Sequence, residues 1–174
     1  MALKKPKEVP QISKAREKKI DKLKKVTPTK KKTEIEFNCK IYFHKDGING
    51  KQKYRFEVET LKIFSFLNYK LTVQARKEKK VIDISLLGLT ALNDYMAKVQ
   101  PANVEIDFEE LFGDYTVNVI KQDGSINSAL VNFNIYKKEI EIIKEFLPEK
   151  KNNSKFCMFE IDKDNFTYSK EYSK

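Results

Sequence analysis

The clearest pattern in this chain is an alternation of apolar and polar residues over residues 114–135. Every second side chain of a β-strand lies on the same face of a sheet, so strict alternation predicts strands with one apolar and one polar face. Residues 122–125 separate two such runs, and their Asp-Gly pair supplies the positive-φ position that a tight turn needs. The segment is therefore predicted to be a β-hairpin. Its apolar face comprises Tyr115, Val117, Val119, Ala129, Val131, Phe133 and Ile135.

The same alternation recurs through most of the chain after residue 34. It predicts further strands over residues 35–43, 53–59, 69–74, 81–87, 103–108, 157–161 and 166–168, and a short strand before a bend at 65–68. Roughly eight to ten short runs with turn residues about every 8 to 12 positions favour a mainly β fold, an antiparallel β-sandwich or barrel. Immunoglobulin-like folds share this spacing, but the tryptophan marker of true immunoglobulin domains is absent.

One segment of the β region has helical rather than alternating periodicity. Leu92, Met96 and Val99 recur at helical spacing, Thr90 can cap the start, and Pro101 lies just past the end. This pattern predicts a short helix over residues 90–100 that covers one end of the β domain.

Residues 139–147 fit two interpretations. Ile140, Ile143 and Leu147 have the spacing of a helix that ends before Pro148. Residues 139–142 also alternate, however, and isoleucine favours strands. The strand is the favoured interpretation.

Positive charge is concentrated at the start of the chain. Residues 1–34 contain 13 Lys or Arg and 4 Asp or Glu, whereas residues 35–174 contain 22 and 21, so most of the net charge of +10 belongs to the first segment. A basic arm beside a near-neutral body is typical of proteins that bind polyanions. The candidate polyanion-binding residues are Lys4, Lys5, Lys7, Lys14, Arg16, Lys18, Lys19, Lys22, Lys24, Lys25, Lys30, Lys31 and Lys32.

We therefore divide the chain into a basic, largely disordered N-terminal arm over residues 1–33 and an antiparallel β domain over residues 34–174. Within the arm, residues 14–25 have the pattern of a helix capped by Ser13, but Ile20 and Leu23 give it only a thin apolar face. An isolated helix of this length is marginal in water, so we expect it to fold only on a partner.

Catalytic chemistry has little support in the sequence. His44 is the only histidine, and no serine, cysteine or glycine-rich segment has the setting of a nucleophile or a phosphate-binding loop. Cys39 and Cys157 lie in alternating runs and are expected to pack as buried apolar residues. Residues 105–109 carry three alternating carboxylates, which suit either a hard cation or a solvated strand, and the strand is favoured. We expect no enzyme activity, cofactor or metal.

The basic cluster at residues 76–80 also has two interpretations, a solvated hairpin turn or a phosphate-contacting patch, and the turn is favoured. The chain has no secretory signal and no run of about 18 apolar residues, so we expect a cytoplasmic protein. The leading hypothesis is a non-enzymatic binding or assembly protein whose basic arm contacts nucleic acid. The alternatives are a structural subunit with its arm on an acidic protein partner and a peripheral adaptor at an anionic membrane.

Overall fold

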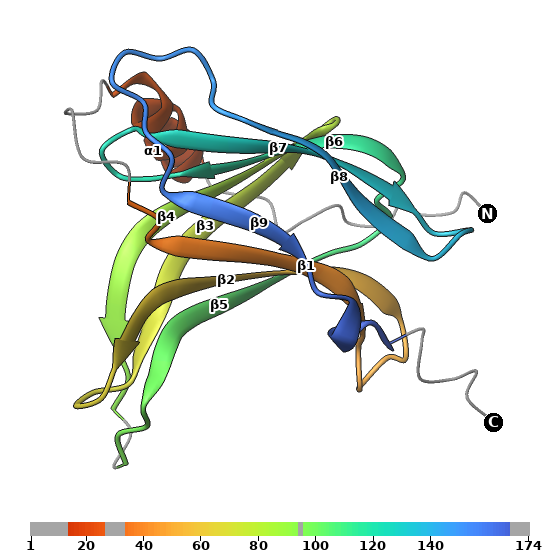
Figure 1. Ribbon diagram of the computed structural model, residues 1–174, viewed down its shortest axis with the longest axis horizontal. Helices are drawn as coiled ribbons and strands as arrows, with labels where there is room; N and C mark the ends of the chain where they lie inside the picture. The colour runs from red at the N-terminus through yellow and green to blue at the C-terminus, as the bar shows by residue number, and fades with distance from the viewer. Residues whose placement is uncertain (1–13, 27–33, 94–95, 168–174) are drawn as a thin grey trace.

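The computed structural model describes residues 14–26, 34–93 and 96–167 of the chain (Figure 1). These residues form a mainly β fold with an α-helix, α1 (Lys14–Lys25), and a short 3₁₀ helix, η1 (Lys163–Asn165). The strands are β1 (Phe37–Lys45), β2 (Gln52–Phe64), β3 (Tyr69–Glu78), β4 (Val81–Ala91), β5 (Gln100–Phe108), β6 (Gly113–Ile120), β7 (Ile126–Asn134), β8 (Glu139–Phe146) and β9 (Cys157–Ile161). The prediction of a mainly β chain is confirmed.

The described strands form one sheet in the order β8-β7-β6-β4-β3-β5-β2-β1-β9. The sheet curls until its two edges, β8 and β9, approach each other, which gives a nearly closed, barrel-like shape (Figure 1). Three neighbouring pairs run parallel, namely β1 with β9, β3 with β5, and β4 with β6. The prediction of a purely antiparallel sheet is therefore wrong, because alternation with a period of two is the same for both strand directions.

The predicted hairpin over residues 114–135 is confirmed. Its strands are β6 and β7, which pair antiparallel from Gly113 opposite Phe133 to Ile120 opposite Ile126. Gly124 in the turn has a φ of +85°, in the left-handed region that glycine adopts without steric cost. The predicted apolar face is buried except for its last member, Ile135, which lies beyond β7 and is 39% exposed.

The predicted helix over residues 90–100 is wrong. Thr90 and Ala91 belong to β4, Gln100 begins β5, and the described residues between these strands are not helical. The side chain of Asn68 holds this connection instead, because its Nδ2 donates to Met96 O at 2.8 Å and its Oδ1 accepts from Lys98 N at 2.8 Å. These bonds fix a non-helical backbone that the local spacing of apolar residues does not reveal.

The favoured interpretation of residues 139–147 is confirmed, because Glu139–Phe146 forms strand β8. Its pairing with β7 shifts register between Leu130 and Val131. Leu130 lies opposite Lys144 and Val131 lies opposite Ile142, so Ile143 is the extra residue of a bulge. The bulge accounts for the mixture of two periodicities in this segment.

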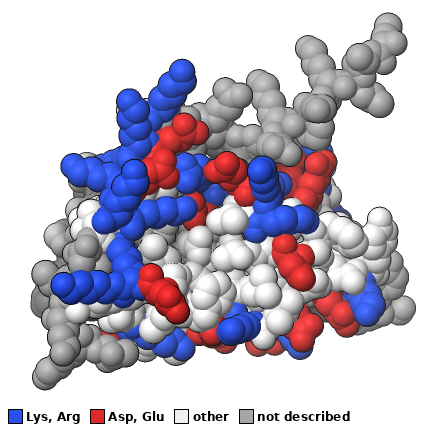
Figure 2. All heavy atoms as spheres, turned by 90° about the horizontal axis from the view of Figure 1, so that it is seen from above, with Lys and Arg blue, Asp and Glu red and all other residues white. Residues whose placement is uncertain are grey.

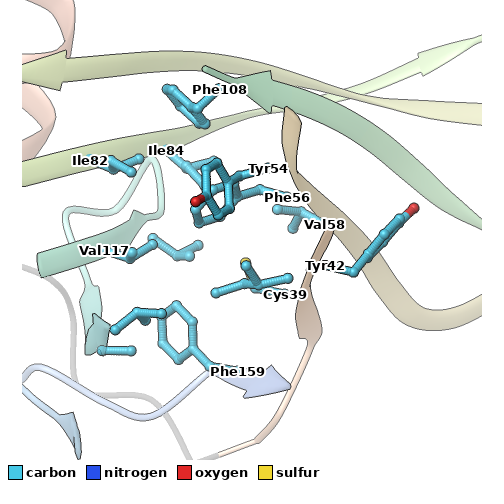
Figure 3. Close-up of a cluster of buried hydrophobic side chains, with 14 of the residues drawn as sticks. Cys39, Tyr42, Tyr54, Phe56, Val58, Ile82, Ile84, Phe108, Val117 and Phe159 are labelled. Atoms are coloured by element: carbon cyan, nitrogen blue, oxygen red, sulfur yellow. The ribbon is translucent and has the colours of Figure 1, made fainter. Parts of the chain in front are cut away.

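Aromatic side chains fill the interior of the sheet (Figure 3). Phe133 is fully buried, and its ring centroid lies 5.0 Å from that of Tyr54, 6.1 Å from Phe56 and 5.7 Å from Tyr115. These residues come from β2, β6 and β7, so one ring connects distant parts of the sheet. Edge-to-face and tilted pairs of this kind stabilise a core beyond the area that they bury.

Both cysteines lie in this interior, as predicted. Cys39 and Cys157 are completely buried and are not disulfide-bonded. Burial raises the pKa of the Cys39 thiol to about 12 and raises that of Cys157 well above its ordinary value. Both side chains therefore act as small apolar groups at neutral pH.

Truncating the central ring tests this description of the core. Phe133→Ala is expected to lower the free energy of unfolding by about 3–5 kcal/mol, because it leaves a cavity among three aromatic rings. Urea unfolding measures the change. The matched control is Ile48→Ala, whose side chain is 93% exposed and whose loss is expected to cost less than about 0.5 kcal/mol. Similar costs for both variants would contradict the assignment of the core.

Candidate functional site

The thirteen candidate polyanion-binding residues fall into two groups. Lys4, Lys5, Lys7, Lys30, Lys31 and Lys32 lie outside the described residues. Lys14, Arg16, Lys18, Lys19, Lys22, Lys24 and Lys25 lie on α1. The structure thus brings seven of the candidates together on one helix, and the packing of that helix decides which side chains face solvent.

A buried carboxylate on the outer face of the sheet holds α1. Asp83 is only 3% exposed, although it points away from the interior that its neighbours Ile82 and Ile84 fill. Lys24 Nζ of α1 lies 2.6 Å from Asp83 Oδ2, and Arg76 Nη2 lies 3.3 Å from the same oxygen. A buried carboxylate is costly unless it is paired, and these two cations offset the cost of burying Asp83.

A second ion pair ties the helix to the same place. Arg76 Nη2 also lies 3.1 Å from Asp21 Oδ1, so one guanidinium bridges a carboxylate of α1 and a carboxylate of β4. Desolvation alone would lower the pKa of Arg76, but its hydrogen bonds and charge interactions with Asp21 and Asp83 together outweigh that effect and raise it. Arg76 therefore stays charged under the helix.

The polar face of the β6–β7 hairpin completes this arrangement. Asn118 Nδ2 donates to Asp83 Oδ1 at 2.9 Å, and Ser128 Oγ donates to Asn118 Oδ1 at 2.6 Å. The carboxylate that binds α1 is also a polar partner for Asn118 on this face of the hairpin. Both oxygens of Asp83 are thus engaged, one by the neighbouring hairpin and one by cations.

Some buried polar atoms on the same face of the sheet have no hydrogen-bond partner among the described residues. Ser85 Oγ and Gln74 Oε1, on facing positions of β4 and β3, and Arg76 Nε are buried without a hydrogen-bond partner among the described residues. Each such group costs about 1–3 kcal/mol relative to a solvated one. These unpaired groups reduce the net stability that the packing of α1 on the sheet provides.

The C-terminal end of α1 packs against the β6–β7 turn. Lys150 Nζ donates to Lys24 O at 2.8 Å and to Gly124 O at 2.5 Å, which joins the helix end to the turn. A Cβ on Gly124 would lie 2.9 Å from Leu23 O and closer still to Val26 O. Burial lowers the pKa of Lys150. A cation at the last carbonyls of a helix also suits the helix dipole.

The helix over residues 14–25 has the bounds that the sequence pattern predicts, and the disorder of the free basic arm stays a prediction. These residues form a helix whose Ile20 is completely buried although it does not belong to the interior core. The thin apolar face is sufficient because Asp83, Arg76 and the β6–β7 turn supply the remaining contacts. The division of the chain at residue 33 remains a prediction.

The outer side of α1 presents its remaining cations to solvent. The exposed basic residues of the helix are Lys14, Arg16, Lys18, Lys19, Lys22 and Lys25. Four of them, Lys14, Lys18, Lys22 and Lys25, form what we call the lysine stripe. Successive helical residues are about 100° apart, so their spacing of four, four and three positions keeps them within an arc of roughly 80°, opposite Ile20. Lys24 is half-buried and bound to Asp83, so it does not belong to the stripe.

The space-filling view agrees with this assignment. Figure 2 shows Lys and Arg side chains projecting on the left of the molecule seen from above, where α1 lies in Figure 1, with a few carboxylates between them. The chemistry of the surface is that of several point charges on flexible stems, which bind anions by charge rather than by shape.

The other charged candidates have structural partners. Arg55 of β2 donates to both oxygens of Asp107 and forms an ion pair of 2.6 Å with Glu105. Both carboxylates lie on the neighbouring strand β5, so they pair with the protein's own arginine. Hydrogen bonding to Asp107 raises the pKa of Arg55. In the basic cluster at residues 76–80, Arg76 lies under α1, and Lys80 binds Phe112 O and covers the ring of Tyr115.

α1 itself has no aromatic side chain for base stacking, and the exposed rings of Phe66, Phe112 and Tyr136 lie elsewhere in the chain. Tyr42 of β1 is 7% exposed, and its hydroxyl donates to Glu57 Oε2 at 3.2 Å. Its ring points away from the interior cluster (Figure 3). Burial raises the pKa of Tyr42 to about 12, so it stays protonated at neutral pH.

A cavity of about 310 Å³ lies where the sheet edges β8 and β9 approach each other. It is lined by Asn127, Ser128, Glu145, Phe146, Leu147, Lys155, Cys157 and Phe159. Asn127 has a structural role, because its Oδ1 accepts hydrogen bonds from Phe156 N and Cys157 N, each at 2.8 Å. Within the described residues, no group of three or more His, Cys, Asp or Glu side chains could hold a metal ion.

Comparison of the chain with protein-family models, curated proteins and solved structures gives no match. Among the residues that the structure describes, no helix is long and apolar enough to cross a membrane. The candidate site therefore depends on geometry alone: a helix held by buried charges, with its lysine stripe turned outward.

The contact between α1 and the β6–β7 turn can be tested by adding one methyl group. Gly124→Ala places a Cβ against the last carbonyls of α1, so the helix is expected to leave the sheet and trypsin to cleave α1 at least about tenfold faster. The control is Gly50→Ala, which has a similar positive φ of +64° and nothing within 4 Å. Equal cleavage rates in both variants would mean that α1 does not pack against Gly124.

Proposed function

We propose that this chain is a non-enzymatic nucleic-acid-binding protein that contacts the phosphate backbone through the lysine stripe of α1. The observation that carries the proposal is the orientation of the helix. The anionic anchor Asp83 uses Lys24 and Arg76, while the four lysines of the stripe remain exposed on the opposite side. The packing of α1 on the sheet therefore leaves the four stripe lysines free of ion pairs with the described strands, so they are available to bind a polyanion.

The dimensions of the stripe support a backbone contact. From Lys14 to Lys25 the helix rises about 16 Å at 1.5 Å per residue. One strand of a duplex rises about 3.4 Å per phosphate along the duplex axis, so the stripe is as long as the axial rise of roughly five phosphates. Since the helix is already formed on the sheet, binding does not require its folding.

The chemistry of the surface favours sequence-independent binding. Lysines contact phosphates without reading bases, and base readout needs side chains in a groove or aromatic rings for stacking. The helix that carries the stripe has no aromatic side chain. We therefore assign affinity to charge alone, with the strong salt dependence that counterion release produces.

Two further features of the chain fit this proposal. We interpret the single curled sheet as a barrel rather than a sandwich, with Lys155 and Glu145 forming an ion pair of 2.9 Å where β8 and β9 approach each other. A cytoplasmic setting, in which nucleic acid is accessible, also fits the two unpaired thiols of Cys39 and Cys157.

Removal of the stripe charges tests the proposal. The variant in which Lys14, Lys18, Lys22 and Lys25 are replaced by Gln is expected to bind a short DNA duplex much more weakly at low salt. The slope of log K against log salt should decrease in magnitude by about 3 to 4, because each phosphate contact contributes about 0.9. Fluorescence anisotropy of a labelled duplex, titrated at several salt concentrations, gives both quantities.

The matched control removes the same number of charges elsewhere. Lys51, Lys137, Lys151 and Lys163 are exposed and lie off α1, so replacing them by Gln changes the net charge equally. The control is expected to keep most of the salt slope. An equal loss in both variants would show that binding follows net charge and not the stripe. Unchanged binding by the stripe variant would remove the proposal.

A further inference from the structure

A group of exposed apolar side chains lies at the end of the sheet where β2 and β4 finish. We call it the apolar tip, and it comprises Ile63, Phe66, Leu67, Leu92, Met96 and Val99. Phe66 is 90% exposed, and Met96 and Val99 are each 75% exposed. Single exposed apolar residues are common on protein surfaces, but a cluster of this kind marks an interaction site.

The two connections that form the tip are joined to each other. Asn68, which follows Phe66 and Leu67, is 3% exposed and binds the backbone of Met96 and Lys98 through its side chain. Its own carbonyl accepts from Leu92 N at 2.8 Å. These bonds hold the two connections that carry the apolar tip next to each other.

The charged residues described around the apolar tip are lysines, whose positive charge suits an anionic surface. Lys62, Lys70 and Lys98 are exposed around the apolar side chains. Over residues 60–72 and 86–103 the sequence contains one acidic residue, Asp94, which lies outside the described residues. Apolar side chains surrounded by lysines resemble the composition of segments that lie in the interface of an anionic bilayer.

The shape of the tip favours a bilayer over a folded protein partner. The β2–β3 and β4–β5 connections project beyond the rest of the sheet at the lower left of Figure 1. A folded protein partner would need a groove that matches the two projecting loops. A bilayer is deformable, so the apolar side chains of the loops can insert between its headgroups and acyl chains without a preformed groove.

We propose that the apolar tip binds the surface of an anionic lipid bilayer. Phe66, Met96 and Val99 enter the boundary between headgroups and acyl chains, and the three lysines contact the lipid phosphates and carboxylates. This membrane-binding surface is separate from the lysine stripe of α1 and depends on apolar contact as well as on charge.

A single tryptophan reports insertion directly, because the chain contains none. In the full chain, Phe66→Trp is expected to shift its emission to shorter wavelength and to be quenched by brominated lipid. The vesicles contain phosphatidylcholine and phosphatidylserine at a ratio of seven to three. Ile48→Trp, at a position that is 93% exposed outside the tip, is expected to show neither effect. Failure of Phe66→Trp to respond would overturn the proposal.

Vesicle sedimentation separates the tip from α1. The variant Phe66→Ser with Met96→Ser is expected to bind these vesicles at least about tenfold more weakly, because two large apolar contacts are lost. The matched control, Ile48→Ser with Tyr136→Ser, changes side chains that are 93% and 85% exposed elsewhere and is expected to bind normally.

Two results would contradict membrane binding by the tip. One is that vesicle binding is unchanged by the tip substitutions but lost when Lys14, Lys18, Lys22 and Lys25 are replaced by Gln, which would assign it to α1. The other is that the tip substitutions leave vesicle binding unchanged but convert a dimer to a monomer in light scattering, which would assign the tip to a contact between two copies of the chain.

Discussion

Burial of the Asp83 carboxylate is the constraint on which the arrangement of this molecule depends. A carboxylate removed from water costs several kcal/mol unless cations and hydrogen-bond donors surround it. Asn118 and Arg76 supply part of that environment from the sheet, and Lys24 supplies the rest from α1. The helix therefore has one favourable position, and its position determines that the lysine stripe faces solvent.

Strand β4 supports both proposed binding surfaces, the lysine stripe of α1 and the apolar tip. Asp83, which anchors α1, lies near the start of β4, and the strand ends at Ala91 beside the apolar tip. The interior rings around Phe133 hold the strands that support both surfaces. A cationic helix and an apolar tip thus occupy different ends of one strand, and each uses a different physical interaction to bind its partner.

Local alternation in the sequence predicts the features that depend on local geometry. The β6–β7 hairpin, strand β8 and the buried cysteines all follow from which side of a strand each residue occupies. Strand direction, the connection that Asn68 holds and the packing of α1 depend on partners that are distant in sequence. Asp83 alternates with Ile82 and Ile84 as a solvent-facing residue would, so no sequence pattern identifies it as the anchor for Lys24.

The most direct test of this account is hydrogen exchange of the backbone amides of α1 in the full chain without any ligand. If Asp83 and its partners hold the helix, the amides from Ile20 to Val26 are protected at low salt, and the protection decreases as salt screens the ion pairs at the helix edge. Exchange of these amides at the rate of an unstructured peptide at low salt would show that α1 is not anchored on the sheet.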